Sequence, residues 1–143
     1  MNGTVKVSDR SSRRRMAKSS LAILERAFRG GLEEQYGHIL WLSRIMKAMG
    51  APTSVMLKGD AVCYALGAQK RQSIIVGDRR VSGISHHASG AMALIRDQVP
   101  LFVWAPDAER LGLQVGEFVD GVQLVDEADW PSLVIRHDCV WYW

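Results

Sequence analysis

The chain has 143 residues, about the size of one domain, and its composition of 48% hydrophobic and 23% charged residues is typical of a globular protein. No apolar run approaches the roughly 18 residues of a membrane span, two cysteines are too few for a disulfide scaffold, and the basic N-terminus lacks the apolar segment of a secretory signal. We therefore expect a cytoplasmic, reducing environment and no membrane partner. The net charge of +3 and the pI near 9.1 raise the question of a nucleic-acid partner.

The basic charge lies almost entirely in the first 18 residues. Residues 1–18 hold six basic residues and one acidic residue, a net charge of +5, whereas the remaining 125 residues hold twelve basic and fourteen acidic residues, a net charge of −2. The first segment is serine-rich and has no apolar period, so we predict a disordered basic tail at residues 1–18 and one domain at residues 19–143. Residues 11–15 are a candidate contact for nucleic acid or an acidic partner, but a solvated leader is the simpler interpretation. Met16 is a plausible translation start, which would make residues 1–15 an upstream extension, and we do not expect the domain itself to bind nucleic acid.

Apolar runs alternate with amphipathic segments along the domain. In chain order, the predicted elements are a strand at 20–24, a loop at 28–31, a helix at 32–49, a strand at 54–57, a helix at 61–66, an ambiguous segment at 68–87, a helix at 89–97, a strand at 99–104, a helix at 106–111, a strand at 121–125, a helix at 129–136 and a strand at 140–143. Gly50 is a natural helix stop, and Asp60 and Asp129 are the predicted N-caps of the helices that follow them. Pro131 suits the first turn after Asp129.

The segment at 68–87 has the weakest pattern. Residues 73–76 are apolar and β-branched, Gly77 and Asp78 form a turn signal, and Arg79 and Arg80 carry exposed charge. A hairpin and a long loop both fit this composition.

Strand–helix alternation and near-continuous apolar strands such as 99–104 are typical of a sheet covered on both faces. We therefore predict an α/β fold with one flavodoxin-like domain, about five mostly parallel strands and helices on both faces. Five strands suggest the order 2-1-3-4-5. The sequence has no internal repeat and no second domain.

Common site motifs are absent from the sequence. There is no GxGxxG, no P-loop and no Cys-x-x-Cys pair. His86 and His87 are adjacent, so they cannot share one face of a regular element, and a metal site would need Asp60 or Asp78 as well. We expect no metal site and no cofactor, and we interpret His137 as a dipole partner at a helix end.

Cys63 lies one turn into the helix predicted after Gly59 and Asp60. A helix N-terminus lowers the pKa of a thiol, so a reactive thiolate is physically reasonable there. Free cysteine is also among the most buried residue types, so a core position is the commoner outcome. Cys139, which precedes the last predicted strand, is expected to be structural.

The last predicted strand carries alternating tryptophans. Trp141 and Trp143 fit internal packing and an oligomer contact equally well, because aromatic residues are enriched in both settings.

Five short stretches carry the pattern of a known family. Residues 25–30 are similar to an R-A-P-Y-G turn, 55–62 to V-S-V-(F/L)-x-G-D-(G/A)-V, 67–69 to K-G-Q, 108–113 to A-x-x-R-G-(L/I), and 134–141 to an H-D-x-V-x-x-(W/F) end. In this order, over residues 20–143, they resemble the DsrE/DsrF/DsrH family, which includes the TusD, TusC and TusB subunits of the bacterial sulfur relay. The resemblance implies a flavodoxin-like fold, assembly into homo- or hetero-oligomers, and a role in persulfide trafficking beside a sulfur-carrier protein.

One position departs from the family pattern. In members of the DsrE/TusD type a cysteine ends the strand before A-x-x-R-G, and Trp104 stands at that position here. Sulfur transfer needs a nucleophilic thiolate, which an indole cannot supply. The resemblance therefore implies a non-catalytic subunit, as in the TusB and TusC types.

We expect a ligand or partner to bind at the edge of the sheet formed by the carboxyl ends of the strands. The candidate residues at this edge are Arg26, Gly30, Lys58, Gly59, Asp60 and Trp104, and the loop with Arg79, Arg80, His86 and His87 is expected to fold over them. Backbone donors, Lys58 and the arginines suit a small anion or the anionic persulfide of a partner. The sequence fits equally well if Gly59 and Asp60 form only a turn and a helix cap and have no binding role.

Three functions remain open from the sequence. The leading hypothesis is an accessory protein of intracellular sulfur trafficking that acts by binding. The second is a sulfurtransferase that uses Cys63, and the third is a small-ligand or metal-binding module that uses His86, His87 and the strand-end loops. Whether the chain is an enzyme is undecided, with a binding protein favoured.

Overall fold

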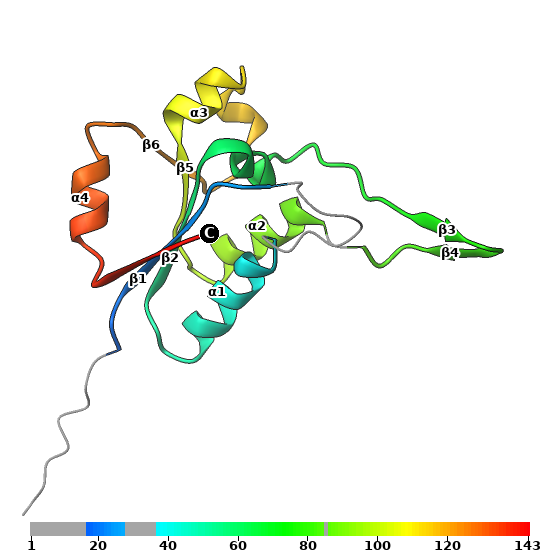
Figure 1. Ribbon diagram of the computed structural model, residues 1–143, viewed down its shortest axis with the longest axis horizontal. Coiled ribbons are helices and arrows are strands. Elements are labelled where there is room, and N and C mark those ends of the chain that lie inside the picture. Colours follow the sequence, from blue (N-terminus) through cyan, green and yellow to red (C-terminus); the bar gives the residue numbers. More distant parts are fainter. Residues whose placement is uncertain (1–16, 28–36, 85) are drawn as a thin grey trace, which may run out of the picture.

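A computed structural model describes residues 17–27, 37–84 and 86–143 (Figure 1). Most of the predicted tail lies outside the described residues. So do Gly30, the predicted loop at 28–31 and the first part of the helix predicted over 32–49.

Five parallel strands form the central sheet. They are β1 (Ser20–Leu24), β2 (Thr53–Leu57), β5 (Leu101–Trp104), β6 (Gln123–Val125) and β7 (Cys139–Tyr142). Their order across the sheet is β6-β5-β2-β1-β7, and each neighbouring pair is parallel. The predicted α/β class with a five-stranded parallel sheet is confirmed, whereas the predicted order 2-1-3-4-5 is wrong. Counted along the chain, the sheet strands lie in the order 4-3-2-1-5.

Ser19 and Asp138 bind each other where the last strand lies beside the first. The backbone N–H and the hydroxyl of Ser19 both donate to the Asp138 carboxylate at 2.8 Å, and the backbone N–H groups of Asp138 and Cys139 donate to the Ser19 carbonyl at 3.0 and 3.1 Å. The hydrogen bond from the Ser19 backbone lowers the pKa of the Asp138 carboxyl. Ser19 and Asp138 are 119 positions apart, so a local apolar pattern cannot predict their contact.

Helices cover both faces of the sheet. On one face lie α1 (His38–Ala48) and α2 (His87–Arg96), and on the other lies the short α4 (Trp130–Ile135) (Figure 1). Along β1, Ala22 and Leu24 pack toward α1 and α2, whereas Leu21 and Ile23 pack toward α4. Every residue of β1 and β2 is buried, and apart from the polar residues Ser20, Thr53 and Ser54 at their amino ends the strands are apolar without alternation, as expected for strands covered on both faces.

Three shorter helices lie between the strands: η2 follows β2, α3 follows β5, and η3 comes between α3 and β6. These are the 3₁₀ helices η2 (Gly59–Ala65) and η3 (Val115–Glu117) and the α-helix α3 (Ala105–Arg110). The helix predicted at 61–66 is therefore a 3₁₀ helix, and its N-cap is Lys58, so the prediction that Asp60 caps it is wrong.

Other predicted boundaries agree with the structure. Gly50 follows α1 with φ +85°, the backbone conformation of a glycine stop. Asp129 is the N-cap position of α4, and Pro131 lies in its first turn. Cys139 opens β7 rather than preceding it.

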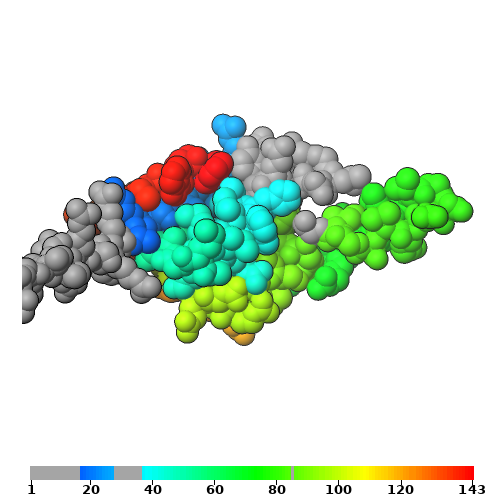
Figure 2. Space-filling model, turned by 90° about the horizontal axis from the view of Figure 1, so that it is seen from below, coloured from blue at the N-terminus to red at the C-terminus, as the bar shows by residue number. Residues whose placement is uncertain are grey.

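The ambiguous segment contains a hairpin. Its strands β3 (Ile74–Val76) and β4 (Arg79–Val81) are antiparallel and turn at Gly77, which has φ +63°. The hairpin projects far from the body of the molecule (Figures 1 and 2), and Arg79 and Arg80 are exposed on it. The expectation that Arg79 and Arg80 fold over the strand ends is therefore wrong.

None of the helices in the described part of the chain is long and apolar enough to cross a membrane.

Candidate functional site

Lys58, Gly59 and Trp104 meet at the carboxyl edge of the sheet. Lys58 and Gly59 follow β2, Trp104 ends β5, and these strands are neighbours. The backbone N–H of Lys58 donates to the Leu24 carbonyl at 2.8 Å, which ties the end of β2 to the end of β1. Parallel pairing therefore brings these residues together, as the sequence predicted.

The ammonium of Lys58 contacts two aromatic rings. Its Nζ lies 5.0 Å from the ring centroid of Trp104 and 5.2 Å from that of Trp130. The two indoles meet edge to face, with their centroids 5.5 Å apart. We call Lys58, Trp104 and Trp130 the Lys58 site. Such cation–π contacts are worth about 0.5–1 kcal/mol when exposed, and Lys58 is half-buried.

Trp130 was missed by sequence reasoning. It belongs to α4, 26 positions after Trp104, and its side chain packs with Trp104 on the face of the sheet that α4 covers. The position of Trp130 next to an N-cap residue predicts a helix start and carries no signal for a contact with Lys58.

The turn at Gly59 requires a glycine. Its φ is +52°, and a Cβ at this position would lie 2.5 Å from the backbone carbonyl oxygen of Glu25. The Gly59 N–H donates to Asp107 Oδ2 at 2.6 Å, and Arg110 Nε is 3.3 Å from the other oxygen of the same carboxylate. The backbone donor that the sequence offered to a small anion is therefore already bound by the chain's own Asp107.

The neighbouring end of β1 carries Glu25 and Arg26, both exposed. The Tyr142 hydroxyl donates to the Glu25 carboxylate. This hydrogen bond, together with burial, raises the pKa of Tyr142 to about 12. Arg26 opposes that shift electrostatically, which places its positive charge near the ends of β1 and β7. Asp60 lies exposed in the first turn of η2.

Cys63 is half-buried in η2 and packs against the larger core cluster. Burial is the main cause that raises the pKa of its thiol. The negative charge of Asp60 adds to the shift, and the positive charge of Arg110 opposes it. A raised pKa leaves the thiol protonated near neutral pH, so these surroundings favour the core interpretation over an activated nucleophile.

His86 and His87 lie at the start of α2 and have different surroundings. His86 is the N-cap: its Nδ1 accepts from the Ser89 N–H at 3.2 Å, and its Nε2 lies 2.9 Å from the Gln69 carbonyl. A carbonyl only accepts, so Nε2 carries the proton. The His87 ring packs on Tyr64 with centroids 4.4 Å apart.

His86 thus holds the base of the hairpin. The Gln69 amide donates to the carbonyls of Cys63, Tyr64 and Leu66 at 2.9–3.0 Å. Both ends of the hairpin segment are thereby fixed to η2 and α2. Within the described residues, no group of three or more His, Cys, Asp or Glu side chains is placed to hold a metal ion.

His137 occupies the helix-end position that the sequence predicted. Its Nδ1 lies 2.8 Å from the Leu133 carbonyl in α4, and its Nε2 lies 3.0 Å from the Ser54 hydroxyl. These bonds attach α4 to the amino-terminal edge of the sheet, opposite the Lys58 site.

Comparison with known proteins supports the fold. The structure is similar to the crystal structure of the YchN protein from E. coli, with a TM-score of 0.68 and 18% sequence identity over 90% of this chain and 100% of that chain. The two chains therefore share a fold, and identity this low carries no statement about activity. No protein-family model matches the sequence, and no curated protein matches it.

Proposed function

We propose that this chain is a DsrE/F-like accessory protein of sulfur trafficking in the cytoplasm, and that it binds a sulfur-carrier protein without accepting sulfur itself. The observation that carries the proposal is the Lys58 site. At the strand end where the family resemblance places a sulfur-carrying cysteine, this chain has Trp104, packed with Trp130 and the Lys58 ammonium.

The chemistry of this site suits recognition of an anion on a partner. A persulfide is anionic near neutral pH, and an ammonium held on two indole faces attracts it without forming a covalent bond. Arg26 at the end of β1 adds a second exposed positive charge along the same edge. The indole faces of Trp104 and Trp130 offer apolar contact to the chain that presents the persulfide.

The raised pKa of Cys63 supports binding over transfer. A sulfurtransferase needs a thiolate that attacks the donor persulfide, and the half-buried Cys63 thiol is kept protonated by its surroundings. His86, with both ring nitrogens in hydrogen bonds, likewise gives little support to a metal-binding module.

The test is binding of a peptide that carries a cysteine persulfide, with the same peptide alkylated at sulfur as the uncharged probe. Isothermal titration calorimetry measures the affinity of each peptide. We expect the persulfide peptide to bind more tightly than the alkylated one, and Lys58→Met to weaken its binding about tenfold. Lys47→Met is the matched control, because Lys47 lies in the last turn of α1.

Two results would overturn the proposal. One is equal binding of both peptides, or no effect of Lys58→Met. The other is a mass gain of one sulfur atom on Cys63 after incubation with the persulfide, which would establish the sulfurtransferase alternative.

A further inference from the structure

The hairpin of β3 and β4 carries a concentrated positive charge. Residues 70–81 hold four basic residues and one acidic residue, a net charge of +3, whereas the other residues of the 19–143 domain hold eight basic and thirteen acidic residues, a net charge of −5. We call residues 70–81 the basic hairpin. Its charged residues are Lys70, Arg71, Asp78, Arg79 and Arg80. The net charge of −2 that the domain shows as a sequence thus combines an acidic body with a basic segment that projects from it (Figures 1 and 2).

The four basic side chains of the basic hairpin are exposed and lack an acidic partner. No ion pair in the described part of the chain includes any of them. Arg80 Nη1 instead donates to the Ser73 hydroxyl at 2.9 Å, and Arg71 Nη2 lies 3.3 Å from the Ser89 hydroxyl. Both partners are uncharged, so the basic hairpin keeps its positive charge for a ligand that arrives from solvent.

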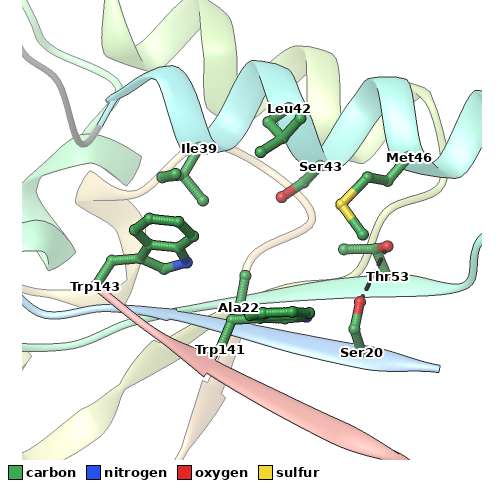
Figure 3. A pocket seen from close by; sticks show the side chains of 9 residues that line it. All are labelled: Ser20, Ala22, Ile39, Leu42, Ser43, Met46, Thr53, Trp141 and Trp143. Carbon is green, nitrogen blue, oxygen red and sulfur yellow. Dashed lines mark hydrogen bonds between the residues drawn. The ribbon is translucent and has the colours of Figure 1, made fainter. Parts of the chain in front are cut away.

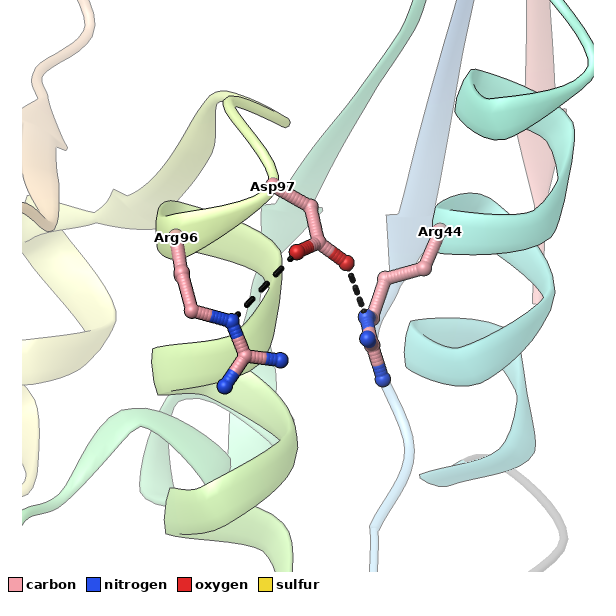
Figure 4. A network of polar contacts seen from close by, with 3 residues as sticks. All are labelled: Arg44, Arg96 and Asp97. Atoms are coloured by element: carbon pink, nitrogen blue, oxygen red, sulfur yellow. Dashed lines mark hydrogen bonds and ion pairs between the residues drawn. The ribbon is translucent and has the colours of Figure 1, made fainter.

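The body around α1 differs from the basic hairpin. The groove between α1 and β7, about 230 Å³ in volume, is lined mainly by apolar side chains such as Trp141 and Trp143, and none of its described lining residues is charged (Figure 3). Arg44 of α1 and Arg96 of α2 both bind the Asp97 carboxylate, with Nε–O distances of 2.5 and 3.5 Å (Figure 4). The hydrogen bond from Arg44 lowers the pKa of the Asp97 carboxyl. Neither feature offers an unpaired positive charge to a ligand.

The two arginines of β4 lie on opposite faces of the hairpin. The strands pair Ile75 with Arg80 and Val76 with Arg79. Directly opposite residues of an antiparallel pair share a face, and successive residues alternate between the faces. Each face therefore presents one guanidinium beside one aliphatic side chain, and Ile75 and Val76 are 68% and 60% exposed.

This arrangement fits double-stranded DNA better than an acidic protein surface. An acidic patch on a protein meets one face of a hairpin and leaves the arginine of the other face in solvent. The major groove of B-DNA admits a two-stranded ribbon, and a phosphate backbone borders it on either side. A guanidinium on each face can then reach one backbone, and guanidinium geometry matches phosphate. The major groove of double-stranded RNA is too narrow and deep for such an insertion.

We infer that the basic hairpin is an arm that enters the major groove of double-stranded DNA, with Arg79 and Arg80 on the two phosphate backbones. Lys70 and Arg71 contact phosphates nearer the body, and the projection of the hairpin keeps the acidic body away from the DNA. The contacts of Gln69 and His86 fix the base of the arm before it binds, which limits the entropy lost on binding. Phosphate contacts carry no sequence information, so the binding is independent of base sequence. The inference does not depend on the ligand of the Lys58 site.

The test measures binding of the full chain to a fluorescently labelled DNA duplex by anisotropy over a range of salt concentrations. The slope of log affinity against log salt concentration changes by about 0.9 for each phosphate that the protein neutralises. Arg79→Gln with Arg80→Gln is expected to reduce the slope by roughly 1.8 and to weaken binding roughly tenfold at about 50 mM salt. Residues 1–18 also carry a charge of +5, so slopes are compared between variants of the same full chain.

Three further variants separate charge from folding. Arg96→Gln with Arg136→Gln removes two exposed arginines of the body and is the matched control, with an unchanged slope. Arg79→Lys with Arg80→Lys keeps both charges and is expected to keep the wild-type slope. Asp78→Asn removes the acidic residue of the basic hairpin and is expected to tighten binding. Far-UV circular dichroism checks that each variant is folded.

Several results would overturn the inference. One is a wild-type chain that does not bind the duplex at about 50 mM salt. Another is a wild-type slope in the Arg79→Gln, Arg80→Gln variant, which would assign the binding to residues outside the basic hairpin. Competition by polyglutamate or by duplex RNA as strong as that by unlabelled DNA would also overturn it, because an acidic protein or any polyanion would then serve as the partner.

Discussion

Two pairs of tryptophans lie at different edges of the same sheet, and their surroundings differ. Trp104 and Trp130 are half-buried, meet edge to face, and hold the ammonium of Lys58. Trp141 and Trp143 are 51% and 43% exposed and face mainly apolar residues of α1 across a groove. The first pair surrounds a charge at the strand ends, whereas the second offers a large uncharged area along a strand edge.

The difference separates two kinds of recognition. A cation held on aromatic faces selects for an anionic group of small size, because charge supplies the attraction. An apolar area without charge selects for another apolar surface of similar size, because burial supplies it. One small domain thereby combines a charged aromatic site with an uncharged apolar groove.

The largest expected effect comes from the backbone at the Lys58 site. Gly59→Ala forces a Cβ to within 2.5 Å of the Glu25 carbonyl oxygen at a φ of +52°, and we expect it to lower the free energy of unfolding by about 3 kcal/mol. Urea denaturation measures this change.

Gly112→Ala is the control for Gly59→Ala. Gly112 has φ +71° with no atom near the position of a Cβ, so it reports the backbone cost alone, about 1 kcal/mol. Equal losses for the two variants would show that the contact with Glu25 relaxes freely.

Substitution of one tryptophan from each region gives the next largest effect. Trp130→Ala removes half-buried packing against Trp104 and is expected to lower the free energy of unfolding by about 2 kcal/mol. Trp41→Ala removes an exposed side chain and is expected to change the free energy of unfolding per chain by less than about 1 kcal/mol.

The smallest expected effect is a pH dependence at the hydrogen bond between Tyr142 and Glu25. The pKa of Tyr142 is raised to about 12, so the bond contributes fully below the unfolded value of about 10 and is lost as the pH rises through 12. Tyr142 is 59% exposed, so the contribution is under about 1 kcal/mol. Melting temperatures are measured between about pH 9 and 12, the range that spans these two pKa values. They should fall more steeply with pH for the wild type than for Tyr142→Phe. Parallel curves would contradict the assignment.

Much of the Lys58 site could be predicted from the sequence. Lys58, Gly59 and Trp104 each follow or end a predicted buried strand, and parallel strands place their carboxyl ends at one edge. Trp130, Asp107 and Glu25 could not be assigned, because their contacts with these residues depend on how α3, α4 and β1 pack. The same limit applies to His86, which caps α2. The Gln69 carbonyl beside it holds the Nε2 proton, which leaves Nδ1 to accept from the Ser89 N–H.

The sequence by itself determined the alternation of strands and helices, the burial of β1, β2 and β5 and the convergence of their ends, because these follow from local apolar patterns. Only the tertiary structure decided that the last strand lies beside the first. The contacts that accompany this neighbour choice are the Ser19–Asp138 bonds and the parallel pairing of β1 with β7, and they join residues distant in sequence. The position of β7 turned an aromatic C-terminal segment into an exposed sheet edge beside α1.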